Sequence, residues 1–94
     1  MKSESMPTLD FYTRSECHIC DEARATLQLV LEERAKRGDP IAHVRYVNLA
    51  DRPDLEADYG AWVPVLEVGG QKLTLSSTYR SISQFLDVTL GRLA

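Results

Sequence analysis

Cys17 and Cys20 are the residues of this sequence best suited to covalent chemistry. They are the chain's 2 cysteines and stand directly after a strand-like run, at the start of a long helix-like run. On the first turn of a helix, side chains at positions i and i+3 lie on one face, so the two sulfurs are close enough to join. The spacing therefore predicts a redox-active Cys17–Cys20 disulfide.

The start of a helix also favours the reactive form of a cysteine. A helix N-terminus carries partial positive charge and unpaired N–H groups, and both stabilise a thiolate over a thiol. The thiolate is the nucleophile. The placement therefore predicts thiol–disulfide exchange, in which Cys17 attacks a disulfide and Cys20 resolves the mixed disulfide.

Length, charge and hydropathy narrow the functional classes. A chain of 94 residues, 44% hydrophobic and 27% charged, is typical of one small globular domain. A net charge of −3 gives no footprint for nucleic acid or an anionic membrane, and no apolar run has the length of a membrane span. Met1–Pro7 lacks the apolar core of a secretory signal, so we expect a cytoplasmic protein. In that compartment a cysteine pair is more often catalytic or metal-binding than a structural crosslink.

The hydrophobic pattern predicts the element order β-α-β-α-β-β-α. Short alternating runs indicate strands, apolar stripes at helical spacing indicate helices, and Gly69-Gly70 indicates a hairpin turn. We expect a disordered tail over residues 1–6 and one α/β domain over 7–94, with a four-stranded mixed sheet flanked by helices. The expected elements are strand 8–13, a loop with the N-cap near Ser15 or Glu16, helix 17–37, strand 41–49, a short helix 51–59 capped by Asp51, strand 64–68, strand 71–75 and a last helix capped at Ser76, Ser77 or Thr78.

This order resembles the thioredoxin fold, and most closely the small bacterial glutaredoxin-like domains. The resemblance lies in the Cys-x-x-Cys that opens the first helix and in the apolar residue and proline before the third strand. Three segments carry it and together cover nearly all of residues 7–94: LDFYTRSECHIC at 9–20, NLADRPDLEADYGAWVPVLEV at 48–68, and the hairpin with the last helix.

The resemblance implies a set of site residues. Cys17 is then the nucleophile and Cys20 the resolving thiol. Val63 and Pro64 are expected to share a cis peptide bond beside the cysteines, which turns the Val63 backbone toward an extended substrate. Arg14 occupies the position where glutaredoxins often carry a basic residue, beside the nucleophile. We expect a monomer that acts on a disulfide-containing protein or a glutathione-type substrate.

The sequence also departs from the glutaredoxin pattern. Glutaredoxins that bind glutathione usually carry Gly-Gly after the fourth strand and then an acidic residue, whereas this chain has Thr74-Leu75-Ser76-Ser77-Thr78. The neutral cap retains N–H donors for a carboxylate but lacks the acidic partner for the glutathione ammonium. We expect no bound cofactor. Glutathione stays a candidate reductant, although the missing glycines and acid weaken its case.

Two charged neighbours of Cys17 act in opposite directions. A protonated His18, which replaces the proline of the usual Cys-Pro-x-Cys, favours the thiolate and tunes the pair toward a more oxidising disulfide. The alternative is an exposed His18 whose imidazole points to water. A carboxylate at Glu16 disfavours the thiolate, unless water solvates it.

Asp10 and Trp62 each have two interpretations. Asp10 lies in a strand expected to be central, where it either handles the proton of the resolving thiol or pairs with a nearby cation or with water. Trp62 lies in the loop before Val63, where it either contacts a partner or folds onto the short second helix.

The sequence thus favours a thiol–disulfide oxidoreductase with Cys17 and Cys20 as its catalytic residues. One alternative is a non-enzymatic redox-sensing or interaction module of the same fold. A second alternative is a carrier of metal or an iron–sulfur cluster. Cys17, His18 and Cys20 offer at most three adjacent ligands, so such a centre needs a second chain or external thiols.

Overall fold

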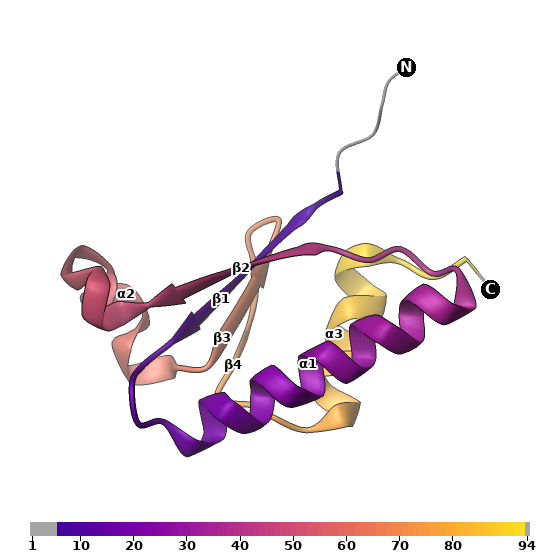
Figure 1. Cartoon of the computed structure of the whole chain (residues 1–94). Coiled ribbons are helices and arrows are strands. Elements are labelled where there is room, and N and C mark those ends of the chain that lie inside the picture. Colours follow the sequence, from indigo (N-terminus) through magenta and orange to yellow (C-terminus); the bar gives the residue numbers. More distant parts are fainter. Residues whose placement is uncertain (1–5, 94) are drawn as a thin grey trace.

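The computed structural model describes residues 6–93, and of the expected disordered tail it therefore includes only Met6, which is exposed. The element order agrees with the sequence prediction (Figure 1). The strands and the helices are β1 (Thr8–Thr13), α1 (His18–Arg37), β2 (His43–Asn48), α2 (Glu56–Tyr59), β3 (Val65–Val68), β4 (Gln71–Thr74) and α3 (Tyr79–Leu90).

The four strands form one mixed sheet in the order β2-β1-β3-β4. β1 pairs with β2 in parallel and with β3 antiparallel, and β3 pairs with β4 antiparallel. This confirms the predicted α/β class with a four-stranded mixed sheet. Because side chains alternate along a strand, β1 directs Leu9 and Phe11 to one face and Asp10 and Tyr12 to the other.

The main core lies on the face that α1 and α3 cover together (Figure 1). Leu9 and Phe11 of β1 are fully buried there against Leu27 of α1 and Leu86 of α3. A smaller core forms on the opposite face, where residues 49–63 pack over Tyr12 and Val65. Tyr12 stacks on Tyr59, with ring centroids 3.9 Å apart. The second core fixes the segment that leads into β3.

The predicted helix over 51–59 is only partly correct. The chain forms the helical turns Leu49–Asp51 and Pro53–Leu55, then α2 and the turn Gly60–Trp62. Asn48, not Asp51, caps the first turn, because its Oδ1 accepts the N–H of Ala50 at 2.9 Å. Pro53 has no N–H, so it cannot continue the hydrogen bonding of the turn before it.

Other boundaries agree more closely with the pattern. Gly69 and Gly70 have φ of 55° and 85°, as the predicted two-residue hairpin requires. Thr78 is the N-cap of α3, and its hydroxyl accepts the N–H of Ser81. β4 ends one residue earlier than predicted, because Leu75 has a φ of 57° that a strand does not accommodate. No helix within residues 6–93 is both long and apolar enough to cross a membrane.

Arg34 joins the ends of α1 and α3 that lie far from the cysteines. Its side chain is 1% exposed. Nε donates to the Pro40 carbonyl at 2.7 Å, Nη1 donates to Asp87 Oδ1 at 2.7 Å, and Nη2 donates to the Gly91 carbonyl. A buried cation is tolerated only with such partners. Arg34 therefore ties α1, the loop after it and the end of α3 into one unit.

Arg34→Met is expected to lower the free energy of unfolding by about 3 kcal/mol, because it leaves Asp87 and two carbonyls without their donor. Arg34→Lys recovers only part of this loss, since an ammonium cannot reproduce the planar donor fork. Urea unfolding monitored by circular dichroism measures the change. Arg80→Met, at an exposed position of α3, is the matched control. Equal stability of the two variants would contradict this role of Arg34.

Asp39 makes the stability of the folded protein depend on pH. The N–H of Leu93 and the guanidinium of Arg37 donate to its carboxylate at 3.1 and 3.0 Å, and they hold the pKa of Asp39 below its ordinary value. The resulting stabilisation is present above the unfolded-state pKa and is lost as pH falls through the lower folded-state pKa. Asp39→Asn should therefore have a lower free energy of unfolding than the parent in urea at pH 7. This gap in free energy should narrow below about pH 4. A gap independent of pH would refute this contribution.

Candidate functional site

Cys17 and Cys20 form a disulfide at the start of α1, with their Cα atoms 5.2 Å apart. Cys17 is itself the N-cap: its backbone is extended, and its Sγ accepts the N–H of Cys20 at 3.2 Å. The prediction of a cap at Ser15 or Glu16 was therefore wrong. Glu16, with a φ of 57°, turns the chain before the helix begins, so the cap falls on the cysteine that follows.

The two cysteines differ in their exposure to solvent. Cys20 is 2% exposed, whereas Cys17 is only partly buried. Cys17 is therefore the more accessible of the two cysteines. The Cys20 N–H, aimed at Cys17 Sγ, is positioned to stabilise negative charge on that sulfur.

The segment before β3 lies at the same end of the sheet. Tyr12 is opposite Val65 in the antiparallel register, so Pro64 lies at the level of Thr13. Thr13 leads into residues 14–17, which we call the cysteine loop. The Val63–Pro64 peptide bond is cis. Val63 has an extended backbone, with φ −65° and ψ 144°, and Pro64 is buried. The fold thus brings this backbone and the start of α1 to the same end of the central strands.

Arg14 joins the cysteine loop to the segment that leads into Val63. Its Nη2 donates to Glu56 Oε2 at 2.8 Å and to the Gly60 carbonyl at 2.7 Å. A Cβ at Gly60 would lie 2.0 Å from Glu56 Oε2 and 2.9 Å from Arg14 Nη2, so the ends of these two side chains would have to move to admit a larger residue. We call Arg14, Glu56 and Gly60 the arginine clamp. Sequence reasoning missed Glu56 and Gly60, since more than 40 residues separate them from Arg14 and no local pattern connects them.

His18 faces solvent and lies on the first turn of α1. Its side chain is 90% exposed, and its Nε2 lies 3.2 Å from Glu22 Oε2. The other oxygen of Glu22 accepts the hydroxyl of Ser77 at 3.2 Å. The i,i+4 spacing of His18 and Glu22 was a signal in the sequence, but the link to Ser77 depends on the tertiary fold. Glu22 thereby connects the first turn of α1 to the loop after β4.

Asp10 and Trp62 are on or near the second face of the sheet. The Arg45 Nε donates to Asp10 Oδ1 at 2.8 Å, so the structure shows the predicted pairing of Asp10 with a cation. Trp62 is 50% exposed and lines a hollow of about 210 Å³ with Tyr59 and Lys72. Its indole is available to a molecule that docks near Val63.

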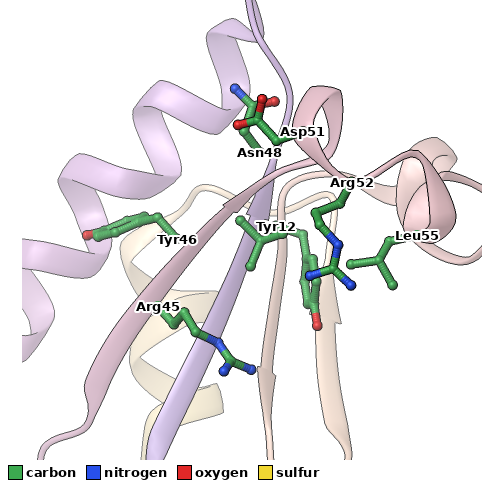
Figure 2. A pocket seen from close by; sticks show the side chains of 8 residues that line it. Tyr12, Arg45, Tyr46, Asn48, Asp51, Arg52 and Leu55 are labelled. Carbon is green, nitrogen blue, oxygen red and sulfur yellow. The ribbon is translucent and has the colours of Figure 1, made fainter.

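A second hollow, of about 440 Å³, lies beside β1 and β2, and Figure 2 shows Tyr12, Arg45 and Arg52 among its lining side chains. Asp10 pairs with Arg45, and Asp54 pairs with Arg52 through two hydrogen bonds. These carboxylates offset the two cations.

Asn48 connects this hollow to the cysteine loop. Its Nδ2 donates to Ser15 Oγ at 3.3 Å, two residues before Cys17. Within residues 6–93, no group of three or more His, Cys, Asp or Glu side chains is arranged to hold a metal ion.

The sheet order, the helices and the disulfide at the start of α1 define a thioredoxin-fold protein with a glutaredoxin-like arrangement. The chain belongs to the family described as the Glutaredoxin-like domain (DUF836), which matches residues 8–89. This confirms the predicted family and fold, and together with the cysteine pair it supports a redox function. No curated protein matches the chain.

Solved structures agree with this assignment. A Northeast Structural Genomics target protein from X. campestris is 31% identical in its X-ray structure, with a TM-score of 0.68 over 85% of this chain and 96% of that one. The solution structure of the same target gives a TM-score of 0.65 at 31% identity, over 88% and 95%. A malarial protein, 13% identical, covers 96% of this chain and 100% of its own with a TM-score of 0.60, and shows the fold alone.

The arginine clamp predicts that Gly60→Ala and Glu56→Ala are coupled. In the parent, the new methyl group must displace the Glu56 carboxylate, whereas in Glu56→Ala that oxygen is absent. Gly60→Ala should therefore cost less in the Glu56→Ala background, with a coupling of at least about 0.5 kcal/mol in a double-mutant cycle of unfolding free energies. Asp58→Ala, an exposed acid of the same helix, should add to Gly60→Ala without coupling. If the losses caused by Gly60→Ala and Glu56→Ala were simply additive, the close approach of Glu56 to Gly60 would be contradicted.

Proposed function

We propose that this protein is a thiol–disulfide oxidoreductase in which Cys17 is the nucleophile and Cys20 the resolving thiol. One observation carries the proposal: in the disulfide at the start of α1, Cys17 is only partly buried whereas Cys20 is buried. Such an asymmetric pair suits an exchange in which one thiol meets the substrate and the other acts only within the protein.

The proposed reaction transfers two electrons to the substrate. The Cys17 thiolate attacks one sulfur of the substrate disulfide, a Cys17–substrate S–S bond forms, and the other substrate sulfur leaves as a thiolate that takes up a proton. Cys20, after losing its proton, then attacks Cys17 Sγ. The Cys17–Cys20 bond forms, and the second substrate sulfur leaves as a thiol. The substrate is reduced to two thiols while the protein dithiol is oxidised to its disulfide.

The neighbouring groups have distinct proposed roles. The extended backbone at Val63, before cis Pro64, pairs with an extended segment of substrate, and Trp62 contacts it from the adjoining turn. Arg14 acts on the same segment, because its guanidinium already holds the Gly60 carbonyl. His18 lies beside Cys17 and, when protonated, favours the thiolate.

The reduced cysteine pair supplies both electrons of the proposed reaction. The cycle therefore requires an external thiol reductant to restore the pair, and no bound cofactor. Glutathione is one candidate reductant. Both cysteines lie on one helical turn, so a monomer suffices. A reducing compartment such as the cytoplasm would maintain the attacking thiol.

Cys17→Ser is expected to abolish the reduction of insulin disulfides, because a serine hydroxyl cannot replace the thiolate. Cys20→Ser should retain the first attack and accumulate a mixed disulfide at Cys17, because the resolving step is lost. Turbidity measures insulin reduction, and intact-mass analysis after acid quenching detects the adduct. Thr26→Ser, at a partly buried position of α1, controls for a conservative change in the helix.

Reduction of insulin by Cys17→Ser at the parent rate would disprove this mechanism. Slow reduction of every disulfide by the parent, together with redox-dependent binding to one partner, would instead favour a sensing module that uses exposed Trp62.

A further inference from the structure

Leu75 adopts a backbone conformation that suits glycine. Its φ is 57°, and it shares a positive φ with only one other non-glycine residue of the described chain, Glu16. A side chain with a Cβ crowds its own carbonyl in this region, so leucine is rare there. An outlier of this kind near a reactive group is a reason to look for a function.

The fold does not require the leucine side chain. The Leu75 N–H donates to the Pro64 carbonyl at 2.9 Å and to the Trp62 carbonyl at 3.2 Å. A glycine would make the same backbone hydrogen bonds and relieve the crowding. The side chain is also 51% exposed, so it does not belong to either core. Neither the backbone hydrogen bonds nor the two cores account for leucine at this position.

The position of Leu75 is next to the redox site. Its backbone is bonded to the segment that contains Val63 and cis Pro64. Two residues later, Ser77 is bonded to Glu22 on the first turns of α1. Leu75 therefore lies in the short connection between the cis-proline segment and the helix start that carries the disulfide. Trp62, which supplies one of the two carbonyl acceptors, is itself 50% exposed.

We infer that Leu75 and Trp62 form an apolar contact surface for polypeptide substrates that carry an apolar side chain next to the reactive cystine. The inference rests on the proposed function. The occupant is a peptide because the extended Val63 backbone offers pairing to a main chain, which a small disulfide lacks. The preferred neighbour of the cystine is apolar because burying it against leucine and indole removes apolar surface from water.

Leu75→Gly is the most informative variant, since glycine suits the backbone and preserves folding. The substrates are two disulfide-linked peptides that differ only in having leucine or serine beside the cystine, together with hydroxyethyl disulfide. The parent should reduce the leucine peptide about 5-fold faster in kcat/KM than the serine peptide. Leu75→Gly should abolish this preference and leave hydroxyethyl disulfide unaffected. Leu75→Asn, which tolerates the same backbone region, should behave in the same way.

Leu93→Gly is the matched control, because it removes an exposed leucine from a non-helical segment after α3. It should keep the parent's preference. A preference retained by Leu75→Gly would overturn the inference while the proposed function survives. An equal loss on all three substrates would assign Leu75 a structural role and also overturn it. A parent that reduces none of the substrates would overturn the proposed function and this inference together.

Discussion

The position of β1 between β2 and β3 is the constraint on which the rest of the site depends. β1 is hydrogen-bonded in parallel to β2 and antiparallel to β3, so its last residue, Thr13, is flanked by the end of β2 and the beginning of β3. The cysteine loop, the turns after Asn48 and the cis-proline segment therefore meet at one end of the sheet, where β1 and β2 finish and β3 begins. Their meeting does not depend on contacts between the loops, which only refine it.

Stability and chemistry are concentrated at opposite ends of α1. At its C-terminal end, buried Arg34 holds α3 and the following loop with three hydrogen bonds. At its N-terminal end the polar contacts are more exposed: Arg14 is bonded to Glu56, and His18 and Ser77 both contact Glu22. Exposed ion pairs contribute little to stability. The redox end can therefore accommodate a substrate without loss of the packing that holds the helices on the sheet.

The fold could be predicted from sequence because its signals are local. Alternation identified β1, helical spacing identified α1, and the glycine pair identified the hairpin. The cysteine pair was also evident, since its spacing is a property of four consecutive residues. Cap preference favours a residue such as Ser15 near the helix start, whereas the left-handed turn at Glu16 moves the N-cap to Cys17. The partners of Arg14 and Glu22 could not be predicted, because they come from distant segments.

The left-handed residues at the redox edge show what a pattern of residue types cannot convey. Glu16 and Leu75 have side chains that give no reason to expect a positive φ, yet both have one, and each adjoins a segment of the site. At Glu16 the conformation has a structural consequence, because it makes Cys17 the cap and places its sulfur at the Cys20 N–H. At Leu75 the structural contacts are made by the backbone alone, because its N–H donates to the carbonyls of Trp62 and Pro64. The side chain, which is part of neither core, is therefore the group that the proposed contact with a polypeptide substrate would use.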